Sequence, residues 1–160
     1  MKIKHLIFIL LMISNLNDIY IMFGLKYNIN PLWLKSLAIV ESNENIYAIN
    51  INKKSYYFKS KQEAHNHLKS LSHSDQIDIG LFQITKHWFN KIDIDLKEGF
   101  NAYTNTEIAC ILLKDIFKRK GHKFSSLPYF HNPTFNSNYY NHLKSVYNKL
   151  KSQPQLIGAN

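Results

Sequence analysis

Apolar residues recur every three or four positions through much of the chain, which is the spacing of amphipathic helices. This pattern predicts helices at residues 18–27, at residues 31–42, after residue 60, from residue 104 to residue 120, and across residues 140–150. The aromatic segment 56–58 instead suggests a small extended or irregular region. With no repeat or linker, 160 residues predict one mainly helical domain that can bury a real core.

Two helix starts carry the capping-box pattern, in which a hydroxyl residue is followed three positions later by Glu. They are Ser60 with Glu63 and Thr104 with Glu107. The helix after Ser60 is predicted to be accessory. The helix after Thr104 is predicted to be central and to end before Gly121, since glycine is common just past a helix.

Glu41 interrupts the apolar face of the predicted helix 31–42. It follows Leu34 by seven positions, Leu37 by four and Ala38 by three, so helical periodicity stacks it on their face. Asn30 is suited to cap this helix, with a proline next in its first turn. An acid in such a place either pairs with a base or is kept partly protonated by desolvation, and the second case describes a general acid.

A second polar motif lies downstream, at residues 78–84 (DIGLFQI). Gly80 allows close approach of the backbone to a ligand, and Gln83 offers an amide donor and acceptor between apolar neighbours. The motif is weak by itself, and only its combination with Glu41 suggests a site.

The ordered motifs resemble the soluble lytic transglycosylase (SLT) family, which has a lysozyme-like domain. The likeness spans about residues 25 to 150, and it is carried by residues 38–43 (AIVESN), 48–50 (AIN), 78–84, 101–105 (NAYTN) and 129–134 (YFHNPT). It is greatest to the small transglycosylases of conjugation, pilus and secretion systems, several of which carry an insert similar to residues 56–58. The resemblance implies a mainly α (α+β lysozyme-like) fold.

In this family one carboxylic acid cleaves the MurNAc–GlcNAc β-1,4 bond of peptidoglycan, first as acid and then as base, and the product is a 1,6-anhydro sugar. The resemblance assigns that acid to Glu41, and it implies no metal and no organic cofactor. It makes Ser42 a residue that positions Glu41, although Ser42 is equally suited to end the helix. Gly80 and Gln83 are implied to border the saccharide groove, and we assign Asn105 to capping or scaffolding rather than to sugar contact. Further supporting residues are Asp78, Tyr129, Phe130 and His131.

Phe130 departs from the family pattern, because many relatives place tyrosine there in a Tyr-His-Ser-Pro-Thr arrangement. The missing phenol puts its hydrogen bond to the catalytic site in doubt. Tyr129 replaces it only if the loop shifts, since adjacent side chains normally point elsewhere. The plain interpretation of Phe130 is a packed groove wall.

The formal charge of +9 is compatible with nucleic acid, anionic lipid or an acidic polymer such as the cell wall, and charge alone does not choose among them. No nucleic-acid reading motif accompanies it. The basic run 118–120 is interpreted as a helix end. Cys110 is the only cysteine and is predicted to be a small core residue, while His65 and His67 are predicted to be solvated surface residues on different helix faces.

Residues 1–17 have the charged start and short apolar run of a secretory signal, although they lack an Ala-x-Ala-like cleavage site. We therefore expect export to the periplasm or cell envelope, with an inner-membrane tether if the leader is retained. The domain is predicted at 18–151 and a tail at 152–160.

The sequence predicts a monomeric peptidoglycan lytic transglycosylase that opens the wall for a conjugation or secretion apparatus, with glycan strands and components of that apparatus as partners and no nucleic acid. Two alternatives remain open. One is a muramidase that uses water, with Glu41 and Asp78. The other is a catalytically weak wall-binding assembly protein, which Phe130 and the basic charge make plausible.

Overall fold

The computed structural model describes residues 15–71 and 76–153. The helices are α2 (Leu16–Tyr27), α3 (Pro31–Ser42), α4 (Lys61–Lys69), α5 (Lys86–Lys91), α6 (Ala102–Lys120) and α7 (Ser137–Lys151), with 3-10 helices η1 (Leu96–Phe100) and η2 (Phe124–Phe130). The strands are β1 (Ala48–Ile51), β2 (Lys54–Tyr57), β3 (Ile77–Ile79) and β4 (Ile84–Thr85). This mainly helical fold with one small sheet confirms the predicted class.

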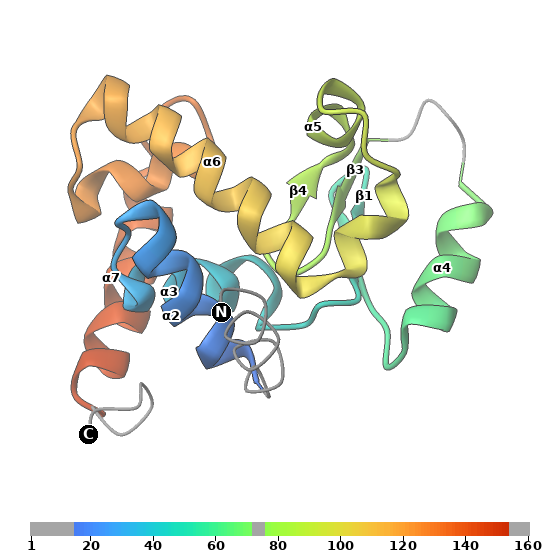
Figure 1. Cartoon of the computed structure of the whole chain (residues 1–160), viewed down its shortest axis with the longest axis horizontal. Coiled ribbons are helices and arrows are strands. Elements are labelled where there is room, and N and C mark those ends of the chain that lie inside the picture. The colour runs from blue at the N-terminus through green and yellow to red at the C-terminus, as the bar shows by residue number, and fades with distance from the viewer. Residues whose placement is uncertain (1–14, 72–75, 154–160) are drawn as a thin grey trace, which may run out of the picture.

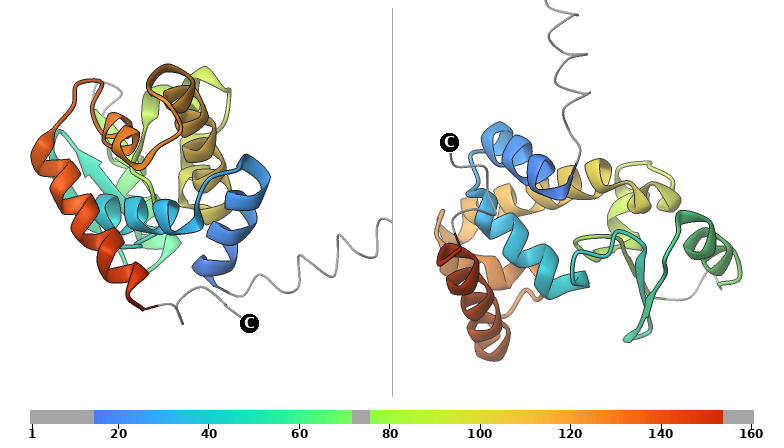
Figure 2. Two further views of the ribbon diagram at one scale, coloured as in Figure 1. Left: turned by 90° about the vertical axis from the view of Figure 1, so that its left-hand side faces the viewer. Right: turned by 90° about the horizontal axis from the view of Figure 1, so that it is seen from below.

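Helices α2, α3 and α7 lie at one end of the molecule and the sheet lies at the other, and α6 runs from one end to the other (Figure 1). Helix α3 lies between α2 and α7 and points its carboxyl end toward the sheet (Figure 2). Helix α4 stands at the outer edge of the sheet end, as expected for an accessory helix. No helix within the described ranges is long and apolar enough to cross a membrane.

Helix α3 has the predicted bounds. The Asn30 side chain accepts a hydrogen bond from the Leu32 amide, and Pro31 occupies the first position. Leu34, Leu37 and Ala38 are fully buried on its inner face. The helix ends where the next residues, Asn43 and Glu44, adopt left-handed backbone conformations with φ of 53° and 60°. The apolar face therefore fixes which way the helix end presents Glu41.

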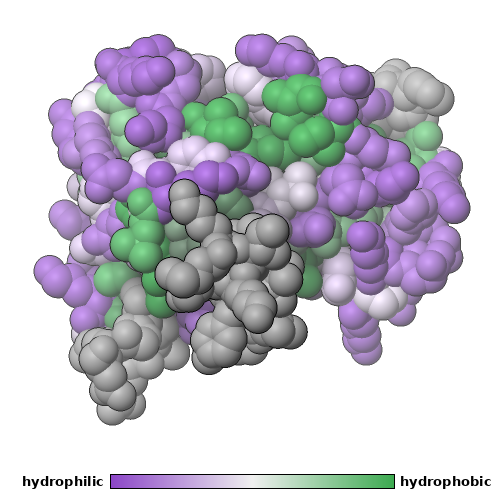
Figure 3. Space-filling model, viewed as in Figure 1, coloured by the Kyte–Doolittle hydropathy of each residue, from purple (hydrophilic) through white to green (hydrophobic). Residues whose placement is uncertain are grey.

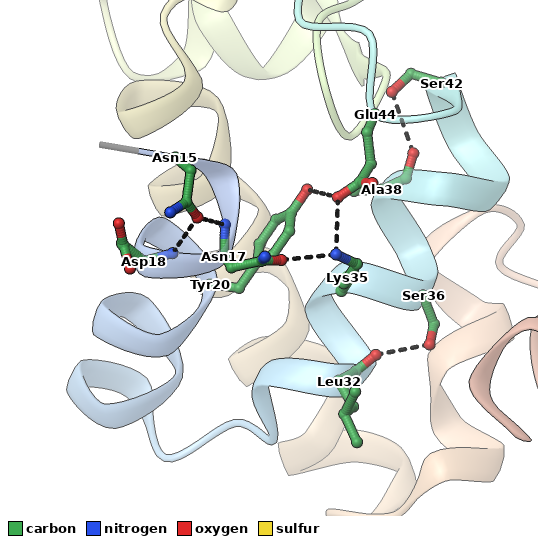
Figure 4. Close-up of polar contacts among 10 residues, drawn as sticks. All are labelled: Asn15, Asn17, Asp18, Tyr20, Leu32, Lys35, Ser36, Ala38, Ser42 and Glu44. Carbon is green, nitrogen blue, oxygen red and sulfur yellow. Dashed lines mark hydrogen bonds and ion pairs between the residues drawn. The ribbon is translucent and has the colours of Figure 1, made fainter. Parts of the chain in front are cut away.

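A polar cluster behind α3 holds this turn (Figure 4). The buried Lys35 ammonium bonds the Asn17 side chain at 2.6 Å and lies 3.8 Å from a Glu44 carboxylate oxygen. The hydroxyl of Tyr20 donates to the same oxygen at 3.0 Å. The cluster joins α2 to the residues just after α3, so it restrains the direction in which the chain leaves that helix.

Helix α2 begins at Leu16, two residues earlier than predicted, with Asn15 as its cap. Residues 15–17 of the proposed leader therefore belong to the start of the domain's first helix. Residues 1–14 of the leader and 154–160 of the proposed tail lie outside the described residues.

The antiparallel sheet has the order β2-β1-β3-β4. Its register sets Ser55 opposite Asn50, Asn50 opposite Asp78, and Asp78 opposite Thr85. Directly opposed residues in antiparallel strands point to the same face. These four polar residues, one from each strand, thus form a row across one face of the sheet.

The second predicted capping box is wrong. Helix α6 begins three residues earlier than the box requires, and the Asn101 side chain accepts from the amides of Tyr103 and Thr104. Glu107 instead accepts hydrogen bonds from Lys26 and Tyr27 of α2. Asparagine is a stronger N-cap than threonine, so the helix begins directly after Asn101.

The helix after Ser60 starts as predicted, with the Ser60 hydroxyl accepting from the Glu63 amide. The prediction of a solvated His67 is wrong. Its ring packs against Tyr56 and Phe58 at 4.8 and 5.2 Å between ring centres, and its Nε2 atom is buried. The predicted extended region is strand β2, and Tyr56 of this strand, together with Phe58 just after it, covers the histidine. Cys110 is fully buried in α6, as predicted.

Candidate active site

A cavity of about 350 Å³ opens between the end of α3, the sheet, η2 and α7, a size typical of small-molecule sites. Five of the residues predicted for the site line it: Glu41, Asp78, Gln83, Phe130 and His131. Ser42, Gly80 and Tyr129 are not among its lining residues.

Glu41 is a nearly buried carboxylate in the cavity wall, with its side chain 9% exposed. The hydroxyl of Tyr139 from α7 donates a hydrogen bond to its Oε1 atom at 2.5 Å. The Nδ1 atom of His131 lies 3.5 Å from the same oxygen. The rings of His131 and Tyr139 stack at 4.6 Å with an angle of 12° between their planes, so the two neighbours of Glu41 also support each other.

Both neighbours approach Oε1. Within the described residues, the other oxygen of Glu41, Oε2, has no hydrogen-bond partner. This leaves one carboxylate oxygen anchored to the protein and the other free for a molecule in the cavity. Such an arrangement suits a group that exchanges a proton with a ligand, because anchoring fixes its orientation without occupying its reactive atom.

The surroundings of Tyr139 keep its hydroxyl protonated, so that it donates the hydrogen bond to Glu41. Burial, and then the nearby Glu41 carboxylate, raise the pKa of the Tyr139 hydroxyl far above its usual value. The Glu41 carboxylate also raises the pKa of His131, with a smaller contribution from Asp78, while partial burial of the ring opposes the change. A protonated His131 therefore pairs with the ionised form of Glu41, and its ring is half exposed, within reach of solvent.

Asp78 is the second carboxyl group of the cavity. It comes from the middle of β3, in the row formed with Ser55, Asn50 and Thr85, all of which line the cavity. The Asn50 side chain donates to the Ser55 hydroxyl at 3.1 Å, which steadies the outer part of the row. This floor of hydroxyl, amide and carboxyl groups offers several hydrogen-bonding atoms to a polar ligand.

Burial, with a further contribution from the charge of Glu41, raises the pKa of Asp78 to about 6. His131 opposes this rise when it is charged. Asp78 thus titrates close to neutral pH, and its charge is coupled to the Glu41–His131 pair.

The loop after β3 is shaped by protein packing. Gly80 has φ of +79°, and a Cβ atom there would lie 2.1 Å from the Gly99 carbonyl oxygen and 2.5 Å from the Asn105 amide nitrogen. The glycine is needed for this contact inside the protein and not for approach to a ligand. Gln83 follows with φ of 48°, and its amide donates to the Gly80 carbonyl at 2.8 Å.

Buried polar side chains hold this loop from behind. The Asn105 amide accepts from the Phe82 backbone at 2.8 Å and donates to the Ile79 carbonyl at 2.9 Å, which confirms its predicted scaffolding role. The Ser42 hydroxyl lies 2.7 Å from the Leu81 carbonyl and 3.1 Å from the Ala38 carbonyl. Ser42 thus ties the end of α3 to the loop, and its contribution to placing Glu41 runs through the backbone.

Phe130 forms part of the cavity wall, with its ring 6.4 Å from that of Phe82 in an edge-on contact. Tyr129 points to a different place, where its ring lies under the Lys120 ammonium and beside Phe135. The phenol that bonds Glu41 comes from Tyr139, nine residues after Phe130.

Sequence reasoning missed Tyr139 and the three residues that form the polar row with Asp78 in the sheet, as well as His142, which lines the cavity from α7. One signal for Tyr139 was available. It precedes the buried Leu143 by four residues, so helical spacing places both on the face of α7 that packs against α3. The sheet residues had no comparable signal, because the strand register is not readable from such short segments.

No group of three or more histidine, cysteine or acidic side chains within the described ranges is arranged to hold a metal ion. Comparisons of the chain with curated proteins and with solved structures gave no match. A scan of protein-family models matched the Transglycosylase SLT domain over residues 18–142, which takes in α2 through the first part of α7 and every residue that lines the cavity. The chain therefore belongs to the family of transglycosylase SLT domains.

Proposed function

We propose that this protein is a peptidoglycan lytic transglycosylase that uses Glu41 as both acid and base. The observation that carries the proposal is the carboxyl group of Glu41, nearly buried in the wall of a cavity, anchored through Oε1 and free at Oε2, in a chain of the SLT family. The substrate is the MurNAc–GlcNAc β-1,4 bond, and the polar row across the sheet supplies hydrogen bonds to the sugars.

In the first half of the reaction, protonated Glu41 gives its proton to the glycosidic oxygen. The bond between that oxygen and the anomeric carbon breaks, and the GlcNAc part leaves as an alcohol. Positive charge develops on the MurNAc ring, where the substrate's own acetamido group and the negative charge of Asp78 stabilise it. Tyr139 holds the carboxyl group in place through its Oε1 atom.

In the second half, the Glu41 carboxylate takes the proton from the 6-hydroxyl of the same MurNAc unit. The 6-oxygen then bonds the anomeric carbon and forms the 1,6-anhydro ring. Glu41 ends protonated, as it began, so the cycle needs no cofactor and consumes no water. A positively charged His131 beside Oε1 stabilises the ionised intermediate state of Glu41.

The direct test is the substitution Glu41→Gln, which keeps the shape of the side chain and removes the transferable proton. We expect at least about a 100-fold loss of soluble product released from purified cell wall, because general acids contribute at least that much. Glu98→Gln is the matched control, since Glu98 is partly exposed on η1 and does not line the cavity. A folded Glu41→Gln protein that turns over like the unchanged protein eliminates the assignment.

A second candidate function is hydrolysis, as in a muramidase. The observation that favours it is Asp78, a carboxyl group coupled to Glu41 in the same cavity. A retaining hydrolase uses such a second carboxylate as nucleophile or charge stabiliser, with water completing the reaction. Under this alternative Asp78→Asn abolishes turnover, whereas the transglycosylase tolerates that change with a partial loss.

We further propose that the protein acts outside the cytoplasm, where it opens the wall locally for a conjugation or secretion apparatus. The charged and apolar start of the chain supports export. A reporter enzyme fused after residue 160 should be active only outside the cytoplasm, and deleting residues 1–14 should abolish that activity. An unchanged cytoplasmic location in both forms contradicts the proposal.

A further inference from the structure

Positive charge is concentrated in the last third of the described chain. Residues 111–153 contain seven lysines and one arginine against a single acid, Asp115, which is a net charge of +7 out of +9 for the whole protein. These residues form the end of α6, η2 and α7, at one end of the molecule (Figure 1). Hydrophilic side chains line the corresponding edge of the surface (Figure 3).

Several of these cations already have partners. Arg119 forms a two-nitrogen contact with Asp115, and the Lys120 ammonium lies over the Tyr129 ring. Lys114 and Lys118 are different. They lie one helical turn apart on α6, and within the described residues neither forms an ion pair with a carboxylate. Both line a recess of about 220 Å³ together with Tyr27, Asn28, Phe117 and His122.

A second and larger recess, of about 540 Å³, adjoins the first. Asn28 and His122 line both, so the two recesses meet at these side chains. The walls of the larger recess include Leu25, Asn30 and Trp33. It shares no lining residue with the cavity of Glu41. Trp33 precedes Glu41 by eight residues on α3, which separates the two sites by about 12 Å along the helix axis.

The recesses combine aromatic rings with unused hydrogen-bond donors. His122 is exposed, stacks on Phe117 at 4.6 Å between ring centres, and meets the edge of Trp33 at 5.7 Å. In the part of the chain that the structure describes, the side-chain amide of Asn28 and the His122 ring nitrogens have no hydrogen-bond partner, while the Asn28 backbone N–H bonds the Gly24 carbonyl. The buried Nε1 of Trp33 has no partner either. Rings, amides and ammonium groups together suit a sugar that carries carboxylates.

We propose that these joined recesses form a second glycan-binding site, which takes a wall glycan strand through its sugar rings at His122 and through its carboxylates at Lys114 and Lys118. The inference rests on the proposed function, because it takes the wall glycan as the ligand. The site holds the enzyme on the wall while the cavity of Glu41 acts on a bond elsewhere. Duplex nucleic acid fits less well, since the two cations beside the aromatic recess form a small pair and not an extended track.

The test measures binding of the full chain carrying Glu41→Gln, so that cleavage does not interfere. Binding to purified uncrosslinked glycan strands, which carry lactyl or peptide carboxylates, is compared with binding to neutral chitin oligosaccharides. We expect Lys114→Gln with Lys118→Gln to weaken strand binding about threefold to tenfold and to leave chitin-oligosaccharide binding unchanged. His122→Ala should weaken binding of both ligands, because the ring contacts the sugar itself.

The matched control is Lys144→Gln with Lys149→Gln, which removes the same charge from exposed positions of α7 outside both recesses. Equal weakening by the two double variants overturns the proposal, since binding then follows net charge. An unchanged affinity in the Lys114 and Lys118 variant also overturns it. So does an equal loss of binding to duplex DNA or to anionic lipid vesicles, which assigns the site to a different partner.

Measurements of activity distinguish failure of this proposal from failure of the proposed function. In the protein with Glu41 intact, the Lys114 and Lys118 variant should raise KM on whole wall and leave kcat on short soluble fragments unchanged. If Glu41→Gln is inactive but the recess variants bind normally, the function stands and the second site fails. If the recess variants lose binding while wall cleavage does not depend on Glu41, the site stands and the function fails.

Discussion

The hydroxyl of Tyr139 is the contact most open to a sharp test, because Phe removes one oxygen atom and keeps the ring. That hydroxyl donates to Glu41 Oε1 at 2.5 Å inside the cavity wall. A hydrogen bond to a charged group contributes about 1.5–3 kcal/mol. If the bond holds the carboxyl group in its reactive orientation, its loss converts to a decrease in kcat of about 10-fold to 100-fold, at about 1.4 kcal/mol for each factor of ten.

The assay is release of muropeptides from purified wall by Tyr139→Phe, with kcat and KM determined separately. We expect kcat to fall and KM to change little, because the hydroxyl contacts Glu41 and not the cavity floor. The stacking of the ring on His131 is retained, so the protein should fold. Tyr140→Phe is the control: its ring packs on Phe124 and Phe135, away from Glu41. A folded Tyr139→Phe protein with unchanged kcat refutes the positioning role.

Three further predictions concern Asp78, Gly80 and Phe130. Because the pKa of folded Asp78 is raised from 3.8 to about 6, its ionisation costs the folded state stability as pH rises from about 4 to about 6. The free energy of unfolding of Asp78→Asn, relative to that of the unchanged protein, should therefore rise by about 1–2 kcal/mol between pH 4 and pH 7.5, after allowance for partial exposure. Urea unfolding that gives the same difference between the two proteins at both pH values refutes this. Gly80→Ala should lower the free energy of unfolding by at least about 2 kcal/mol, since the new methyl group meets the Gly99 carbonyl. A smaller loss of unfolding free energy, measured in urea, contradicts the packing argument. Phe130→Tyr should retain or increase turnover while Phe130→Ala weakens saccharide binding; wall binding without product in both the unchanged protein and Phe130→Tyr favours the assembly-protein alternative.

The sequence was most informative where helical periodicity acts over a few turns. The bounds of α3 and the inward direction of Glu41 follow from apolar spacing and from the Asn30–Pro31 start, and both agree with the structure. The scaffolding role of Asn105 was also predicted. The start of α6 was not predicted, because two capping residues lie three positions apart and the capping-box pattern favoured Thr104 over the stronger cap, Asn101.

The composition of the cavity depends on contacts between distant parts of the chain. Asn50, Ser55 and Thr85 join Asp78 only through strand register, and the four strands are two to four residues long. Tyr139 reaches Glu41 across 98 residues of sequence through the packing of α7 on α3. Motif reasoning located the missing phenol at Phe130 and looked for its replacement at Tyr129, the neighbour in sequence. In the structure, the phenol that bonds Glu41 belongs to Tyr139 of the next helix, α7.

The role of Gly80 illustrates a second limit. A glycine in a motif beside a candidate site suggests close approach of a ligand, and a positive φ would be compatible with that interpretation. The surroundings of the residue give a different reason, since the Gly99 carbonyl and the Asn105 side chain occupy the space. Only coordinates distinguish a glycine that makes room for a ligand from one that makes room for the protein.

The central claim is that Glu41 directs closure of the 6-hydroxyl onto the anomeric carbon and that water takes no part. It is tested most directly by digesting purified wall in ¹⁸O-water and determining the mass of the new sugar ends. The account predicts unlabelled 1,6-anhydromuramoyl ends, produced by the unchanged protein and, more slowly, by Asp78→Asn. Reducing ends that carry ¹⁸O as the main product, together with complete inactivity of Asp78→Asn, would contradict it and make the protein a muramidase.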